Sequence, residues 1–230
     1  MVGQLMAFAI PSQCRQLILG VTPGWNDSHV QLQCWEHGNS KWFPVSPTWE
    51  GRVGRNGLAW GRGLSPNQKG LQKQEGDGRA PAGVFMLGGL YGYAPSFPCK
   101  PGVLYHQITP RDLWVEDPES PYYNSHLHLK TAGPTNDWER KQQMKLNDEA
   151  HSLKIFIRHN AGPTRVRGGG SSIFFHIWRR SGDSPSSGCT VMPKEDLEKL
   201  ARWVDPQMTP LYVLLSQEEY TRLKPLWNLP

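Results

Sequence analysis

Ser171–Met192 reads SSIFFHIWRRSGDSPSSGCTVM, an alternating apolar run followed by a segment rich in turn-forming residues. The alternation predicts a strand that carries Phe174 and His176 on one face and the other apolar residues on the opposite face. The Ser, Gly, Asp and Pro residues that follow allow the chain to double back. We therefore expect Cys189 to lie beside His176.

A thiol beside an imidazole is the minimal pair for acyl transfer, because the histidine can remove the thiol proton before the sulfur attacks a carbonyl carbon. Gly188 has no Cβ, so it permits a strained turn and a close approach of substrate. We expect backbone N–H groups near Cys189 to form an oxyanion hole. On residue types alone, a buried structural cysteine near a half-buried histidine explains the pattern equally well.

The order of a histidine, a turn-rich spacer and the sequence Ser-x-Gly-Cys resembles the active-site motif of the YkuD-type L,D-transpeptidases. These are cysteine enzymes that cross-link or trim bacterial peptidoglycan. Further stretches resemble landmarks of one branch of that family, in the family's order, over roughly residues 50 to 215. They are Glu75–Phe85 (EGDGRAPAGVF), Trp114–Asn124 (WVEDPESPYYN), the pair His159-Asn160 and Trp203–Pro206 (WVDP).

The resemblance implies a mainly β fold with peripheral helices, a sandwich-like or barrel-like catalytic domain. The composition agrees, because 24 Gly, 20 Pro and 37% hydrophobic residues suit a loop-rich β protein. We expect a single domain over residues 1–230, with additional strands at its N-terminal end within residues 14–45. Peripheral helices are expected in three places: at Trp138–Met144 within the stretch Thr135–Met144, with Asp137 as cap; on the apolar stripe Leu197–Val204; and after the capping box that Ser216 opens.

The resemblance also implies roles for individual residues. Cys189 is the expected nucleophile and His176 the expected base, with Ser187 and Gly188 forming the turn before the nucleophile. Four more residues are expected to bind substrate, namely Tyr123, Asn124, His159 and Asn160. For His159, a place behind His176 and a satisfied core position are equally compatible with the sequence.

The motif departs from the family pattern at two positions. Many members carry a histidine directly before Gly-Cys and an arginine or asparagine two residues after the cysteine. Here those positions hold Ser187 and Val191. The arginine that clamps substrate is therefore missing, and Arg179 or Arg180 is the expected replacement.

Three functions remain open at this point. The first is L,D-transpeptidation, in which a stem peptide donates an acyl group from its third or first residue through a cysteine thioester to an amine of a second stem. The second is hydrolysis of the same stems by an L,D-carboxypeptidase or amidase. The third is a non-catalytic module that binds the wall. Tyr93–Asn124 is expected to cover the cleft as a lid and so to favour transfer over hydrolysis, and alkylation of Cys189 near neutral pH is expected to separate an enzyme from a module.

The expected partners are peptidoglycan stem peptides, with carbapenems as possible inhibitors and no cofactor. The formal charge of +5 and the pI near 9.1 suit an anionic partner, but no basic run or nucleic-acid-binding motif is present. His126 and His128 share a strand face, yet the sequence shows no third or fourth ligand, so no metal site is expected.

The same substrate implies a periplasmic or envelope location, although no export signal is evident. Met1–Pro11 is apolar, lacks a basic start and is too short to cross a membrane, so it is either the remnant of a signal or a first strand. If Cys189 is free, one disulfide can form among Cys14, Cys34 and Cys99, and unpaired core thiols are the alternative.

Overall fold

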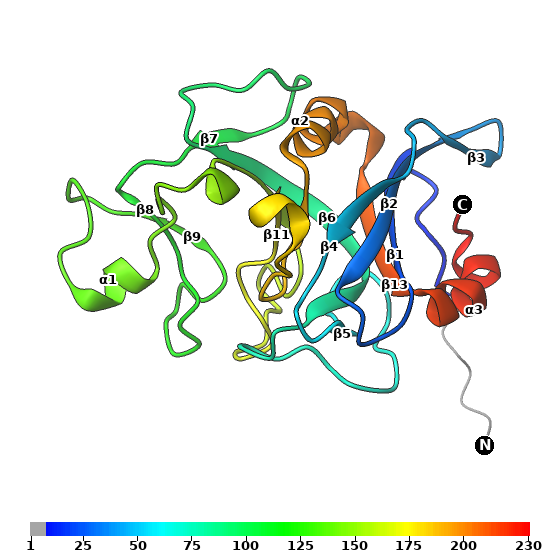
Figure 1. Ribbon diagram of the computed structural model, residues 1–230, viewed down its shortest axis with the longest axis horizontal. Helices are drawn as coiled ribbons and strands as arrows, with labels where there is room; N and C mark the ends of the chain where they lie inside the picture. Colours follow the sequence, from blue (N-terminus) through cyan, green and yellow to red (C-terminus); the bar gives the residue numbers. More distant parts are fainter. Residues whose placement is uncertain (1–7) are drawn as a thin grey trace.

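The structure is a computed structural model that describes residues 8–230, and the expectation of a signal remnant or first strand at the start falls largely outside that range. Figure 1 shows a β-rich body that holds both the described N-terminal strands and the C-terminus, with a smaller lobe on the other side. No helix among the described residues is long and apolar enough to cross a membrane.

Eight strands of the body form a closed ring. The hydrogen-bonded order is β1–β13–β6–β10–β11–β12–β4–β2, and β2 pairs again with β1. A closed ring leaves no free sheet edge, and the expected barrel-like β fold is therefore confirmed. The strands are β1 (Gln16–Thr22), β2 (His29–Gly38), β4 (Trp49–Arg52), β6 (Ala80–Gly92), β10 (Leu153–Ile157), β11 (Phe174–Ile177), β12 (Thr190–Met192) and β13 (Leu211–Ser216).

Strand β6 joins the body to the smaller lobe. It runs for 13 residues and pairs antiparallel with both β13 and β10. At its two ends it pairs in parallel with β5 (Leu58–Trp60) and β7 (Tyr105–Gln107). Strand β3 (Lys41–Pro44) extends the sheet beyond β2. One long strand thus contributes to the barrel wall and then carries the chain towards the lobe (Figure 1).

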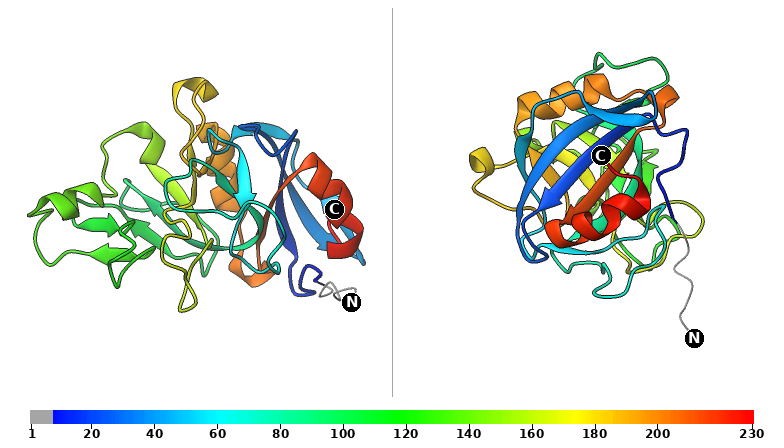
Figure 2. Two further views of the ribbon diagram at one scale, coloured as in Figure 1. Left: turned by 90° about the horizontal axis from the view of Figure 1, so that it is seen from below. Right: turned by 90° about the vertical axis from the view of Figure 1, so that its right-hand side faces the viewer.

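Two helices pack on the outside of the barrel (Figure 2). Helix α2 (Lys194–Trp203) contacts β10 and β11, and the expected stripe is buried at Leu197, Leu200 and Ala201. Helix α3 (Gln217–Trp227) contacts β1 and β13. It begins as predicted, because Ser216 Oγ accepts a hydrogen bond from Glu219 N.

The smaller lobe surrounds the short sheet of β8 (Asp112–Trp114) and β9 (His126–His128). Its helix α1 spans only Asp137–Lys141, and Asn136 rather than Asp137 is the cap, because the Asn136 side chain accepts from Glu139 N. The predicted helix and cap were therefore wrong in extent and in residue. Beneath the lobe lies an apolar cluster, which consists of Ile108, Trp114, Met144, Phe156 and Phe174.

Three single turns of 3-10 helix complete the structure. They are η1 (Glu149–His151), η2 (Arg180–Gly182) and η3 (Pro206–Met208). All four cysteines lie within the described residues and all are free. Cys14 and Cys34 are buried. They are therefore unpaired core thiols, which was the alternative to a disulfide.

Two glycines with left-handed backbone allow a matched test of packing against strain. Gly57 has φ +79°, and a Cβ there would lie 2.1 Å from Trp25 O, whereas Gly168 has φ +68° with no atom within 4 Å. Gly168→Ala should cost about 1 kcal/mol of backbone strain, or roughly 2–4 °C in melting temperature. Gly57→Ala should lower the melting temperature several times more, because the backbone at Trp25 must also move. Equal melting temperatures for the two variants would contradict this packing.

Candidate active site

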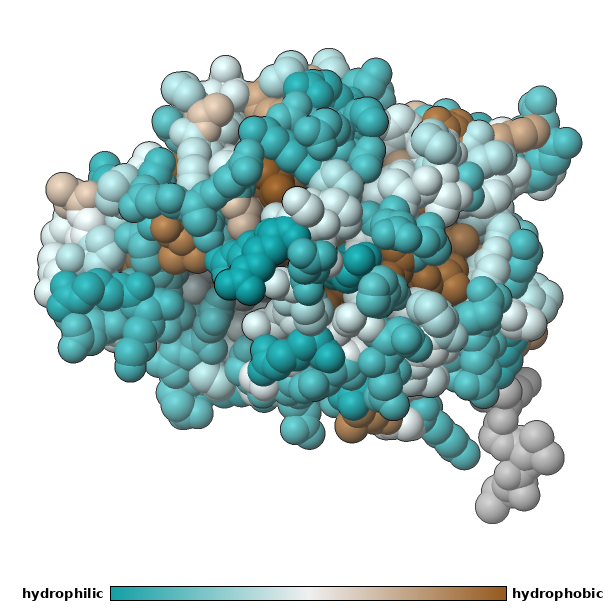
Figure 3. Space-filling view, viewed as in Figure 1, coloured by the Kyte–Doolittle hydropathy of each residue, from teal (hydrophilic) through white to brown (hydrophobic). Residues whose placement is uncertain are grey.

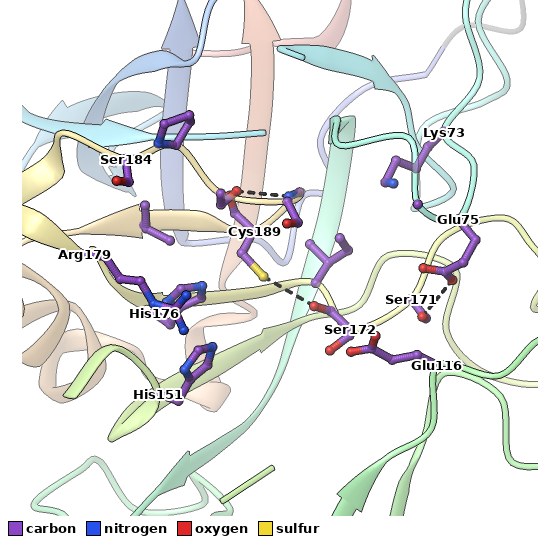
Figure 4. Close-up of a pocket in the computed structure, with 17 residues that line it drawn as sticks. Lys73, Glu75, Glu116, His151, Ser171, Ser172, His176, Arg179, Ser184 and Cys189 are labelled. Carbon is purple, nitrogen blue, oxygen red and sulfur yellow. Dashed lines mark hydrogen bonds between the residues drawn. The ribbon is translucent and has the colours of Figure 1, made fainter. Parts of the chain in front are cut away.

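Parallel pairing of β11 with β12 brings the predicted residues together. The register places His176 beside Val191, and Cys189 lies two residues before Val191 at the entry to β12. Because side chains alternate along a strand, Cys189, Val191 and His176 face the same side of the sheet. Both Cys189 and His176 line a pocket of about 340 Å³ (Figure 4).

The thiol of Cys189 is held by two backbone groups. Phe174 N–H donates to Sγ at 3.4 Å, and the S–H donates to Ser172 O at 3.3 Å. Burial raises the pKa of Cys189 to about 11, although the Phe174 N–H and the charge of Lys154 oppose that rise. The resting sulfur is therefore a thiol. Slow alkylation at neutral pH is expected even of an active enzyme, so that test does not separate an enzyme from a binding module.

His176 is buried, with 9% of its surface exposed. Its Nδ1 lies 2.8 Å from Ile177 O, and since a carbonyl only accepts, Nδ1 carries the proton. Nε2 is then unprotonated and able to accept one. Burial, helped by the neighbouring His151, lowers the pKa of His176 to about 3, so the imidazole is neutral at rest.

The turn before Cys189 is fixed by close packing and by hydrogen bonds. Gly188 has φ +151°, and a Cβ there would lie 2.9 Å from Arg79 O. Gly188 N donates to Ser186 Oγ at 3.0 Å, and Ser186 Oγ donates to Cys189 O at 2.5 Å. Ser187 is exposed at the pocket rim, where its Oγ accepts from Arg55 at 3.1 Å.

A second histidine lies against His176. The rings of His151 and His176 stack with centroids 4.9 Å apart and planes at 26°. His151 Nδ1 lies 2.7 Å from Asp148 Oδ1, while Asp148 Oδ2 accepts from Arg179 at 2.8 Å. The sequence analysis did not identify His151 and Asp148. The available signal was their Asp-x-x-His spacing, which suits a turn capped by the aspartate.

Lys154 is the other residue that sequence reasoning missed. It is 6% exposed and lies opposite His176 in the pairing of β10 with β11. Its Nζ lies 5.5 Å from the centre of the Phe174 ring. Burial lowers the pKa of Lys154 to about 8, and a thiolate at Cys189 would oppose that shift. The available signal was a single lysine inside an otherwise apolar strand.

The two candidate arginines differ in position. Arg179 lines the pocket and is paired with Asp148, and its side chain is 57% exposed. Arg180 is exposed, has φ +50° and does not line the pocket. The structure therefore brings Arg179 to the pocket that holds Cys189 and His176 and leaves Arg180 outside it.

The four residues expected to bind substrate do not line this pocket. His159 is completely buried, with Nδ1 accepting from Arg62 N–H and Nε2 directed at Gly169 O. Asn160 is buried and bonds within the loop that follows it, to Val166 and Gly170. Contact of these residues with substrate stays a prediction. Their side chains hold loops together.

Asn124 and Tyr123 build the wall behind the pocket. Asn124 Nδ2 donates to the carbonyls of His159 and Asn160, and its Oδ1 accepts from Trp114 and from Ser172 N. Tyr123 donates to the carboxylate of Glu75, which itself lines the pocket. These two residues act through the groups they position, because Ser172 O is the acceptor for the Cys189 thiol.

A smaller cavity of about 80 Å³ reaches the same pair from the side of the lobe. Cys189, His176 and His151 line both cavities, and Trp114 and Lys154 belong to the smaller one. Glu116 borders both, while Glu75 borders only the larger (Figure 4). On the face shown in Figure 3 the surface is mostly hydrophilic, with hydrophobic residues in scattered patches.

The chain was compared with curated proteins and with solved structures. No curated protein matches the sequence. Among solved structures, the helical cell shape determining protein Pgp2 from Campylobacter jejuni is similar at 14% identity and a TM-score of 0.43, covering 92% of this chain and 51% of that one. A lysine-to-alanine mutant of Pgp2 gives a TM-score of 0.42 at the same identity, covering 93% and 51%. This chain thus spans about half the length of those structures.

The family comparison covers most of the chain. The model of the YkuD family, described as the L,D-transpeptidase catalytic domain, matches residues 32–213. That range contains five of the eight ring strands whole, parts of β2 and β13, the two cavities and the Cys189–His176 pair. The chain therefore belongs to the YkuD family of L,D-transpeptidase catalytic domains.

Proposed function

We propose that this protein is a cysteine acyltransferase that cross-links peptidoglycan stem peptides, with Cys189 as nucleophile and His176 as base. The observation that carries the proposal is a thiol and a neutral imidazole in one pocket, with the imidazole's Nδ1 proton engaged by Ile177 O. That engagement leaves Nε2 as the proton acceptor that acyl transfer requires.

The reaction then runs in two halves. The Cys189 proton moves from its contact with Ser172 O to His176 Nε2, and Sγ attacks the carbonyl of the third residue of a donor stem. The C–N bond breaks as His176 returns the proton to the departing D-amino acid, which leaves a thioester. An amine of a second stem attacks the thioester, passes its proton through His176 and restores the thiol.

The two cavities support transfer over hydrolysis. A donor in one cavity and an acceptor in the other would meet at Cys189, which borders both. The carboxylates of Glu75 and Glu116 offer partners for an ammonium group, and Arg179 offers a partner for a stem carboxylate. Trp114 and Met144 of the lobe close the smaller cavity with apolar surface, which shelters a thioester from water.

The principal alternative uses the same residues. In an L,D-carboxypeptidase or amidase, water takes the place of the acceptor amine. In either case the proposed substrate lies in the bacterial periplasm or envelope, and we propose that location for the protein. A wall-binding module without catalysis is disfavoured because the unprotonated Nε2 of His176 belongs to the same pocket as the Cys189 thiol, and binding alone does not need that pairing.

Product masses distinguish transfer from hydrolysis. With purified disaccharide-tetrapeptide, we expect dimers that have lost one terminal D-amino acid, and no turnover by Cys189→Ala or His176→Ala. Dimers that lack more of the donor stem would move the acyl donor to the first residue. Shortened monomers alone would contradict the transferase, and activity of Cys189→Ala would contradict the mechanism.

The charge of Lys154 should control the thiol. Because burial lowers the pKa of Lys154 to about 8, its ammonium is present below pH 8 and is lost above it. Lys154→Arg keeps a charge throughout, since arginine does not lose its proton in this range. The rate of Cys189 acylation by a carbapenem, divided by the rate for Lys154→Arg, should be constant from pH 5 to about 7 and fall above about 8. A ratio that stays constant to pH 10 would show that the charge has no role.

Arg179 and Arg180 form a matched pair for the substrate clamp. Arg179→Lys keeps the charge but loses bidentate geometry, so we expect the KM for the donor stem to rise by about tenfold or more. Arg180→Lys, outside the pocket, should leave KM unchanged. An equal effect of both substitutions would indicate a general influence of surface charge instead.

A further inference from the structure

The lobe beside the active site contains a cluster of metal-ligating side chains. Within residues 8–230, one ligand atom each from His106, Asp112, His126 and His128 lies within 4.8 Å of all the others. The sequence showed His126 and His128 on one strand face. The structure adds His106 from β7 and Asp112 from β8 as the third and fourth groups.

The geometry of the cluster centres on one oxygen. His106 Nε2 lies 2.7 Å from Asp112 Oδ1, and His126 Nε2 and His128 Nδ1 each lie 2.8 Å from it. The other oxygen, Oδ2, accepts from both the backbone N and the side-chain Oγ1 of Thr109. Thr109 therefore fixes the carboxylate so that Oδ1 points at the three rings.

Hydrogen bonding alone accounts poorly for this convergence. Each imidazole must direct an N–H at the same oxygen, which offers two lone pairs to three donors. The rings are also crowded, with centroids of His106 and His126 4.5 Å apart. Asp112 is completely buried, whereas the side chains of His106, His126 and His128 are 40%, 22% and 44% exposed. A cation held between the nitrogens and the oxygen gives every group a partner.

We propose that His106, Asp112, His126 and His128 bind a structural zinc ion. Three imidazole nitrogens and one carboxylate oxygen are a borderline donor set that suits zinc, whereas calcium and magnesium prefer oxygen ligands alone. Zinc bonds of about 2.0–2.1 Å in a tetrahedron place ligand atoms about 3.3 Å apart, so small side-chain adjustments complete the site. The carboxylate contacts to Thr109 act as the outer shell that orients a ligand.

The zinc ion would stabilise a lobe that contains little regular secondary structure. Strands β8 and β9 have three residues each, and the ligands come from both of them and from β7. Tyr91 lies between the cluster and the catalytic side, with its ring 5.6 Å from His126 and 6.0 Å from Phe174. Binding would hold Trp114 over the smaller cavity next to Cys189. The ion takes no part in the proposed acyl transfer, and the inference is independent of that reaction.

The test is zinc binding by the full chain after dialysis against a chelator. Titration with ZnCl2 against a chromophoric competitor should show one equivalent bound with submicromolar affinity. His106 is partly exposed and His128 is exposed, so their substitution should not disturb the core. His106→Ala and His128→Ala should each weaken zinc binding by about 100-fold or more, because loss of a residue that merely orients a ligand already costs 10- to 100-fold in metal affinity. The exposed His29→Ala is the matched control and should bind as the parent does.

The active-site thiol and imidazoles are the competing explanation for any bound zinc. The Cys189→Ala variant should therefore still bind one equivalent of zinc. Bound Co²⁺ should give the visible absorption bands of a tetrahedral site, without a charge-transfer band from a thiolate ligand. Zinc should raise the melting temperature of the parent and of Cys189→Ala but not of His128→Ala. No binding by the parent at micromolar ZnCl2, or loss of binding in Cys189→Ala, would overturn the proposal.

Discussion

The parallel hydrogen bonding of β11 to β12 is the interaction on which the site depends. It sets His176 beside Val191 and thereby puts the Cys189 thiol on the same face of the sheet. Every other feature of the site supports this register. Gly188 passes close to Arg79 O. The Ser186 hydroxyl accepts from Gly188 N and donates to Cys189 O, so the turn that enters β12 has little conformational freedom. A shift of one residue would turn the thiol to the opposite face.

Burial determines the charge state of the pair. Removing both groups from water raises the pKa of Cys189 and lowers that of His176, so neither is charged at rest. In the reaction that we propose, charge develops only when substrate arrives, and the groups that can stabilise it are already in place. Lys154 is the cross-strand partner of His176, while Asp148 contacts His151, whose ring stacks on His176. The arrangement resembles a preorganised polar environment more than a preformed ion pair.

The sequence predicted those parts of the site that are close together in the chain or carry a family motif. Cys189 and His176 meet those conditions, and the strand alternation around Phe174 was correct. His151 and Lys154 come close to Cys189 and His176 only when β10 pairs with β11, and no local sequence pattern predicts that pairing. Asn124 shows the limit of a family resemblance. The resemblance identified the position, but the direction of the side chain depends on hydrogen-bond partners such as Ser172, which is 48 residues away in the sequence.

The closed ring has a consequence for the order in which the protein can fold. Its seam joins β1 to β13, where Leu17 pairs with Leu211, so nearly the whole chain lies between the two partners. During synthesis β1 can form its hairpin with β2 at once, but its other edge has no partner until β13 has left the ribosome. Pairing over such a separation is slow, and an exposed edge is prone to aggregation while it waits. The barrel wall therefore stays open at this edge until β13 is available to pair with β1.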